Sequence, residues 1–306
     1  MSGEVVPTGS YCYARLPNAG LGNMLFIWAR ALVYAHLSGS RLIVSPWTKL
    51  KVGPLLRGES HRRWYRGYFK QMDNTHRLVR WWVLLTYPRV NEPSFEFSQC
   101  SLPSRALYVF STIPHWRDYF GSIRDYREFV RTKLYESVSD RHLEALARAE
   151  PPIVGVHVRC GDFRVLSPGE DFAKVGLVRT PLSYFQDVIR SIRVIHGSDV
   201  PVTVFSDGHD EELAALLAMP NIQRAAPNCD IVDLLLLSRS GLVVASAGST
   251  FGYWAGFLAD SPLILHPDHI HAPFRPDDIN ERFYEGGPGQ PAERWPTLLK
   301  QNISAL

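Results

Sequence analysis

The sequence predicts an α/β protein with two Rossmann-like domains that face a cleft. Near the N-terminus, a strand, a glycine turn, a helix and a second strand follow one another. After Pro151, short apolar runs alternate with helical patterns, which is typical of a doubly wound sheet. The chain of 306 residues has room for two domains. We expect residues 1–150 to form the first domain and 151–306 the second, with a C-terminal tail that is a candidate to pack back on the first.

The first domain is expected to open with a βαβ unit. Its two strands run parallel because a helix joins them, and such crossovers are right-handed. Residues 46–105 are rich in aromatic and basic side chains but have weak periodicity, so they receive no assignment. The expected elements are a strand at 10–16, a turn at 18–23, a helix at 24–37, strands at 41–45 and 106–112, and one or two helices within 118–149.

The second domain is expected to alternate strands and helices throughout. Thr180 is the expected N-cap of its first helix, because a proline follows at the first helical position. Ligands of such sheets bind at the carboxyl ends of the strands, so the loops there should carry the chemistry. The expected strands are 153–158, 201–206, 221–225, 242–246 and 262–266, and the expected helices are 182–192, 209–218, 230–240 and 250–259.

The composition is that of a globular protein, with 45% hydrophobic and 21% charged residues. The charge is uneven, because residues 41–90 hold eleven lysines and arginines against two acids, Glu59 and Asp73. This asymmetry fits an acidic partner for the region, or a solvated face that balances acids elsewhere.

The cysteines and the apolar stretches exclude several classes of protein. The four cysteines lie far apart without a CxxC or Cys/His pattern, so we expect no zinc site and no need for an oxidising compartment. The first ten residues lack the apolar core of a signal peptide. The longest apolar stretch, residues 79–87, is far shorter than the ~20 residues of a spanning helix. We expect a cytoplasmic protein of bacterial type, with the inner face of the membrane as an alternative location.

Two loops at strand ends have the composition of anion sites. In residues 16–26, glycines allow close backbone approach, and Asn23 stands where a helix begins with open N–H groups. After the strand 153–158, alternation places His157 and Arg159 on one face. Two interpretations of Arg159 stay open, an ion pair with Asp162 and a guanidinium that forks onto a phosphate.

A third loop, residues 246–250, follows a strand and starts a helix. Its backbone N–H groups, two hydroxyls and the positive helix end converge, as a diphosphate requires. In the preceding helix, Asp233 lies among leucines and isoleucine. It is either an exposed helix acid or an acceptor for the paired donors of guanine.

Four segments, in order, resemble those of the bacterial α-1,2-fucosyltransferases. Residues 20–35, GLGNMLFIWARALVYA, are similar to the N-terminal segment of that family. Residues 155–163, GVHVRCGDF, resemble the HxRRxD segment shared by α-1,2-, α-1,6- and protein O-fucosyltransferases. Residues 202–208, VTVFSDG, resemble the third segment, and residues 230–258 resemble the last, where SxSSFSWWAAWL is typical. Together these four matches are fairly specific.

The resemblance implies a GT-B type fold and an inverting glycosyl transfer without metal or cofactor. GDP-fucose would be the donor, and a glycan or glycoconjugate the acceptor. Carried over by position, Arg159 would contact the β-phosphate, His157 the nucleotide and Asp233 the guanine, and Ser249 and Thr250 would hold the diphosphate. Gly22 would bind the donor, and Asn23 would bind the donor and face the reacting centre from the first domain as a catalytic residue. Cys160 stands where the family usually has its second arginine, and Met24 stands where it usually has a glutamine. These two differences bear on the donor sugar and the linkage more than on the reaction class.

The implied reaction needs positive charge near the departing diphosphate. No DxD-type metal motif is convincingly placed, so Arg159 and the helix start at 249–250 are the candidates. Asp162 either deprotonates the acceptor hydroxyl or braces Arg159, and Asp207 is either a further candidate base or a turn residue, as an Asp-Gly pair after a strand usually is. Family members work with little base assistance, so the reaction is compatible with the absence of a base.

The acceptor is expected to bind within residues 46–120. Residues 61–70 mix cations with aromatic rings, which suit an acidic or lipid-linked glycan. An anionic membrane is a further candidate surface, and without an RNP motif we expect no nucleic-acid partner. The acceptor-binding candidates are Arg62, Arg63, Trp64 and Tyr65.

Two other classes of function stay open. One is a transferase with a different donor, either another GDP-sugar or a sulfonucleotide, because each would use an arginine and a helix N-terminus. The other is a catalytically silent carbohydrate-binding relative of such an enzyme.

Overall fold

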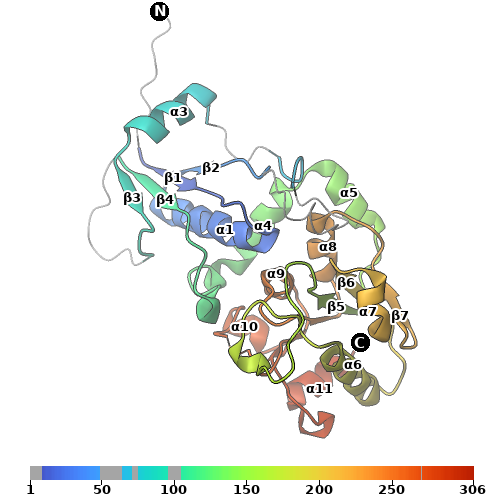
Figure 1. Cartoon of the computed structure of the whole chain (residues 1–306). Coiled ribbons are helices and arrows are strands. Elements are labelled where there is room, and N and C mark those ends of the chain that lie inside the picture. The colour runs from blue at the N-terminus through green and yellow to red at the C-terminus, as the bar shows by residue number, and fades with distance from the viewer. Residues whose placement is uncertain (1–8, 49–63, 71–74, 96–104, 270) are drawn as a thin grey trace, which may run out of the picture. The chain divides into compact units, whose positions relative to one another are not determined.

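The computed structural model confirms the α/β fold class (Figure 1). It describes residues 9–48, 64–70, 75–95, 105–269 and 271–306. The described chain divides into two compact units, and the division falls at Ser139 rather than at the expected residue 150. The helix α5 (Asp140–Arg148) belongs to the second unit because it packs on α8 (Asp230–Leu237). The residues 116–118 also belong to the second unit.

The first unit is a parallel sheet with a helix on each face (Figure 1). Side chains alternate across the sheet, so Tyr11 and Val109 pack against α3, while Tyr108 and Phe110 pack against Tyr34 of α1. The strand order is β2-β1-β4-β3. The elements are β1 (Tyr11–Ala14), α1 (Leu21–Ser38), β2 (Arg41–Val44), α3 (Arg77–Thr86), β3 (Arg89–Asn91), β4 (Leu107–Phe110), a 3-10 turn (Arg124–Tyr126) and α4 (Arg127–Ser137).

The second unit holds a larger parallel sheet, in the order β10-β9-β8-β5-β6-β7. Its strands and helices alternate as the sequence predicts, with α10 and β10 added after the last expected strand. The remaining elements are β5 (Val154–Val158), α6 (Leu182–His196), β6 (Val202–Ser206), α7 (Asp210–Leu217), β7 (Ile222–Arg224), β8 (Leu242–Val244), α9 (Thr250–Leu258), β9 (Leu263–Ile264), α10 (Asp277–Asn280), β10 (Glu285–Gly286), α11 (Thr297–Ser304) and 3-10 turns at Trp116–Asp118, Phe172–Lys174 and Ala292–Arg294.

The two faces of β5 show why the helices lie where they do. Val154, Val156 and Val158 join one apolar cluster, which α6 covers. On the opposite face, a Cβ at Gly155 would lie 2.7 Å from a methyl carbon of Leu237. Glycine at this position therefore lets α8 pack directly on β5.

The C-terminal tail completes the core of the second unit. Trp295, Leu299 and Ile303 are buried in the same cluster as β5, and α11 packs on α6. The tail therefore packs on the core of the second unit, and its expected return to the first unit stays a prediction.

A buried arginine fixes the last strand. Arg275 is fully buried, pairs with Glu285 at 3.0 Å and donates to the carbonyl oxygen of Ser261 at 2.6 Å. These groups compensate the buried charge of Arg275. The segment that contains α10 is thereby held in a position where β10 pairs with β9.

The strand order of the second unit defines a topological switch point. From β5 the chain adds β6 and β7 on one side, and it then returns to add β8, β9 and β10 on the other. The loops after β5 and β8 therefore leave the sheet in opposite directions, and the crevice between them is the usual ligand site of such sheets.

Within the described ranges, no helix has the length and apolar character needed to cross a bilayer.

Candidate functional site

Ser246 ties β5 and β8 together at the switch point. Its hydroxyl accepts the backbone N–H of Arg159 at 2.8 Å and donates to the carbonyl oxygen of His157 at 2.9 Å. The side chain is fully buried, so water does not compete for these bonds. One hydroxyl thus sets where both loops begin.

Arg159 lies between two carboxylates. One end of its guanidinium donates to Asp207 and the other to Asp162. Asp207 also accepts the backbone N–H of Cys160 at 2.8 Å and is 19% exposed, whereas Asp162 is 48% exposed. Asp207 is therefore anchored to the backbone, and Asp162 is the partner that an incoming anion could displace.

This arrangement bears on two residues considered from the sequence. Asp207 is not a plain turn residue, because it holds Arg159 in place. Asp162 occupies the bracing position, one of the two roles considered for it. Asp207 directly follows β6, and the parallel pairing of β6 with β5 brings its carboxylate to Arg159.

The loop 246–250 is shaped by hydrogen bonds to two side chains. The N–H of Ala247 donates to the hydroxyl of Thr180 at 2.9 Å, and the N–H of Gly248 donates to the hydroxyl of Tyr253 at 2.6 Å. Gly248 has a φ of 70°, a conformation that favours glycine. Thr180 therefore braces this loop, and Pro181 takes the N-cap position that was expected of Thr180.

Beyond these braces, α9 begins with an open first turn. Tyr253 is the first residue of the helix whose N–H reaches a carbonyl of the preceding turn, that of Ser249 at 3.2 Å. Ser249 is buried at the N-cap, and its side chain makes no capping hydrogen bond. The amides of Thr250, Phe251 and Gly252 therefore form the positive end of a helix that starts at the switch point.

His157 is a neutral side chain that seats α9 on β5. Its ring stacks on Phe251 with centroids 5.1 Å apart, and a Cβ at Gly252 would lie 3.0 Å from Nδ1. Burial lowers the pKa of His157 to about 4, so the ring carries no charge near neutral pH. Among the described residues, Nδ1 has no hydrogen-bond partner.

Cys160 occupies a tightly packed position. A Cβ at Gly208 would lie 2.6 Å from the Cys160 sulfur, so there is little room for a longer side chain. Burial raises the pKa of the thiol, which keeps it protonated and unreactive. Cys12, Cys160 and Cys229 are all free thiols.

Asp233 carries a buried carboxylate oxygen at the first turn of α8. Its Oδ1 atom has no hydrogen-bond partner within the described chain. Burial raises the pKa of Asp233 from its ordinary value of 3.8 to about 7, and the nearby Asn228 only partly offsets this. The exposed-acid interpretation therefore fails for this oxygen. An unpaired buried acceptor is unfavourable, which makes Asp233 a candidate to accept hydrogen bonds from a ligand.

The predicted residues of the first unit have mixed outcomes. Gly22 and Asn23 lie in the first turn of α1, which begins at Leu21, three residues earlier than expected. Trp64 is partly exposed, but Tyr65 is 2% exposed and packs on Tyr68. Tyr65 therefore belongs to the core and does not present its ring to an acceptor. The predicted Arg62 and Arg63 lie outside the described residues.

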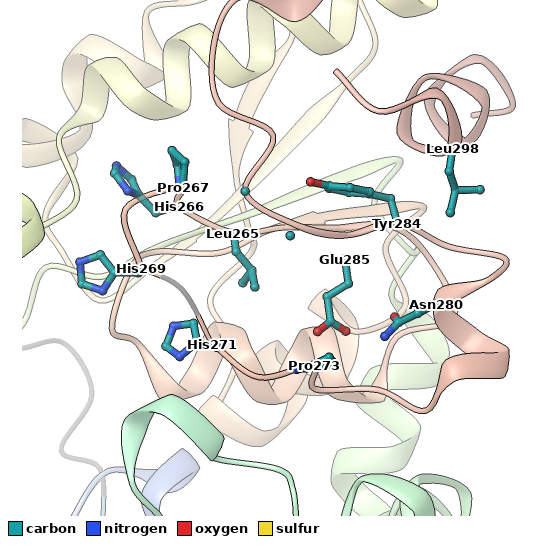
Figure 2. Close-up of a pocket in the computed structure, with 12 residues that line it drawn as sticks. Leu265, His266, Pro267, His269, His271, Pro273, Asn280, Tyr284, Glu285 and Leu298 are labelled. Carbon is teal, nitrogen blue, oxygen red and sulfur yellow. The ribbon is translucent and has the colours of Figure 1, made fainter. Parts of the chain in front are cut away.

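A pocket of about 420 Å³ lies beside the sheet of the second unit and was not predicted (Figure 2). Figure 2 shows His266, His269 and His271 on one side of it, opposite Tyr284 and Glu285. Burial lowers the pKa of all three histidines, to about 4 for His266. In the part of the chain described here, no three His, Cys, Asp or Glu side chains converge as a metal site would need. The sequence signal was the spacing of three histidines directly after β9.

A hydrogen-bonded chain joins this pocket to the loop 246–250. Nδ1 of His271 lies 2.7 Å from the carbonyl oxygen of Trp116, so it must donate, and the neutral ring then accepts at Nε2. Nε2 lies 3.0 Å from the hydroxyl of Tyr253, which in turn accepts the N–H of Gly248. The pocket wall therefore supports the loop.

Comparison with known proteins finds a glycosyltransferase family and a fucosyltransferase relative. A family model described as Glycosyl transferase family 11 matches residues 10–279. The galactoside alpha-(1,2)-fucosyltransferase 1 of Bos taurus is 24% identical over 266 residues, which cover 81% of this chain and 66% of that protein. The matched part is thus slightly less than two thirds of the bovine protein.

Among solved structures, the fucosyltransferase NodZ from Bradyrhizobium is similar in fold. It matches with a TM-score of 0.53 at 14% identity, over 85% of this chain and 96% of the NodZ chain. This likeness confirms the fold class, two α/β units of the GT-B type.

The carboxyl group of Asp233 should lower the stability of the ligand-free protein at pH values above 3.8, the pKa of this group in the unfolded chain. An acid whose folded pKa is raised binds its proton more tightly when folded, so stability is lost as the pH rises from about 4 towards 7. Asp233→Asn should therefore raise the free energy of unfolding at pH 8 by about 1–2 kcal/mol, a value reduced for partial exposure of the side chain. Urea unfolding at pH 4 and pH 8 measures this. An equal effect at both pH values would contradict a buried, titrating carboxyl.

Proposed function

Because the chain belongs to glycosyl transferase family 11, we propose that it transfers fucose from GDP-fucose to a hydroxyl group of a glycan or glycoconjugate. The observation that carries the choice of donor is the unpartnered, buried Oδ1 of Asp233. The fucosyltransferase relatives support the choice of sugar. The expected cytoplasmic location and bacterial origin stay predictions.

Asp233 is proposed to read the guanine base. The Watson–Crick edge of guanine presents two adjacent donors, N1–H and N2–H₂, and a carboxylate accepts both. Uracil presents a single ring N–H between two carbonyl oxygens, which would face the carboxylate unfavourably. A carboxyl that titrates near pH 7 when empty should ionise on binding, because the base donors stabilise the charged form.

Arg159 and the first turn of α9 are proposed to hold the diphosphate. In the ligand-free protein Asp162 and Asp207 neutralise Arg159, and a diphosphate would take the place of Asp162. Asp207 would stay, since the backbone of Cys160 anchors it, and would keep the guanidinium oriented. As the bond from the sugar to the β-phosphate breaks, negative charge grows where these donors already point.

Displacement of Asp162 offers a route for the acceptor proton. Once the diphosphate holds Arg159, the carboxylate of Asp162 is released next to the reacting centre. It can take the proton of the acceptor hydroxyl while that oxygen attacks the sugar from the face opposite GDP, which inverts the configuration. Asn23 and Gly22 of α1, and the partly exposed Trp64, remain the proposed contributions of the first unit.

The transfer is proposed to need no metal ion, because Arg159 and the helix end supply the positive charge. Activity measured with EDTA should therefore equal activity without it, within a factor of about two. Transfer that EDTA abolishes and Mg²⁺ or Mn²⁺ restores would contradict this mechanism.

Arg159→Ala should lower kcat by roughly 10²–10³, as expected when a group that stabilises developing charge is lost. Arg159→Lys should recover little, because a point charge cannot bond Asp207 and a phosphate as a planar fork does. Arg164→Ala is the matched control, since Arg164 lies in the same loop but pairs with Glu170 at the surface. Near-normal turnover of a folded Arg159→Ala protein would assign Arg159 to a structural ion pair.

Asp233→Ala should weaken GDP binding by about 2–4 kcal/mol, because a buried base edge loses charged hydrogen bonds. Inosine diphosphate, which lacks the 2-amino group, should bind wild type more weakly than GDP by about 1–2 kcal/mol, and this difference should shrink in the variant. GDP affinity of wild type should also fall as the pH drops below 7, since the carboxyl must ionise.

Calorimetric titration with GDP, inosine diphosphate, UDP and adenosine 3′,5′-bisphosphate measures these differences. Asp230→Ala is the control for charge, because Asp230 lies in the same helical turn. Equal discrimination between GDP and inosine diphosphate in wild type and Asp233→Ala would show that guanine is read elsewhere. Preference for another nucleotide would favour a different donor.

A further inference from the structure

The helix α3 has two apolar faces. Its inner face, which includes Val79 and Val83, packs on Tyr11 and Ile43 of the first sheet. Its outer face carries Leu78, Trp81 and Leu85, which are 73%, 66% and 75% exposed. These three residues are spaced by three and four positions, so they form one stripe along the helix. We call them the α3 stripe.

A stripe of this kind is unusual on a helix that covers a sheet. The outer face of such a helix is normally polar, because only the inner face is buried. Single exposed apolar residues need no explanation, but aligned ones mark an interaction surface. A tryptophan among them is notable, since its ring favours the boundary between water and apolar surroundings.

Positive charge surrounds the α3 stripe. Arg77 is exposed in the first turn of α3, and Arg89 donates to the carbonyl oxygen of Leu84 in the last turn. Arg105 lies over the ring of Trp82, 4.9 Å from its centroid. Among the described residues 75–95 and 105, the sole acid is Glu92, which pairs with Arg30 and accepts two backbone N–H groups.

We propose that the α3 stripe docks the first unit on the surface of an anionic lipid bilayer. Leu78, Trp81 and Leu85 would enter the boundary between headgroups and acyl chains, and Arg77 and Arg89 would lie among the phosphates. Amphipathic helices with apolar and basic side chains bind membranes in this way, with the helix axis in the plane of the interface. The inference is independent of the donor, and it would place the transferase beside a lipid-linked acceptor.

The same observations disfavour a second copy of the chain as the partner. Packing two copies of α3 about a two-fold axis would bring the arginines of one copy close to those of the other. Three side chains on one short helix also bury much less area than a stable dimer interface requires. A negatively charged lipid surface avoids both difficulties. It attracts the arginines beside the α3 stripe, and binding to it does not require a large protein–protein interface.

Vesicle flotation tests the proposal with the full chain. Wild type should float with phosphatidylcholine vesicles that contain phosphatidylglycerol, weakly with phosphatidylcholine alone, and less at high salt. The variant Leu78→Gln, Trp81→Gln and Leu85→Gln should bind at least about tenfold less, and Arg77→Glu should lose mainly the preference for anionic vesicles. Val194→Gln is the matched control, because Val194 is 75% exposed on α6 of the second unit.

Two further measurements keep the result interpretable. GDP affinity and the melting temperature of the triple variant should equal those of wild type, so a failure of donor binding is separate from a failure of docking. Equal flotation of wild type and the triple variant, or no flotation of wild type, overturns the proposal. Light scattering that finds a wild-type dimer and a monomeric triple variant also overturns it, in favour of self-association through the α3 stripe.

Discussion

Ser246 follows β8, and its hydroxyl group bonds to the backbone of His157 and Arg159 at the end of β5, so the geometry of the site depends on this junction. It fixes the departure of the chain towards Arg159 and, from the neighbouring strand, towards the start of α9. Parallel strands bring their carboxyl ends to one edge, but they do not specify how far apart the loops begin. A buried serine with both hydrogen-bonding roles satisfied makes that separation definite.

Burial shifts the pKa values of His157 and Asp233 in opposite directions. Near neutral pH, His157 is held uncharged, so it contributes shape and packing rather than charge. Burial raises the pKa of Asp233 to about 7, so small changes in its surroundings change its charge near neutral pH. In both cases desolvation is the main cause, and the different outcome follows from the charge that each side chain carries when ionised.

Much of the fold could be predicted because its strands are short apolar runs separated by amphipathic helices. The elements of the second unit from β5 to β9 were placed to within a few residues on this basis, and Asp233 and Arg159 became candidate site residues through their positions at strand and helix ends. The helix α3 was missed, since apolar residues on both of its faces obscure the helical period. The roles of Asp207, Thr180 and Tyr253 depend on contacts between distant segments, which local patterns do not encode. Tyr65 shows the reverse error, because its composition suggested a surface that packing removed.

The unpartnered oxygen of Asp233 also has a consequence for the lifetime of the protein in a cell. An empty site that is internally unfavourable makes the folded state depend on whatever fills it, and a ligand that binds the native chain alone shifts the equilibrium towards folding. Proteases that act on opened chains would then remove the empty form faster than the filled one. A nucleotide bound in the proposed way would therefore lengthen the life of the folded chain.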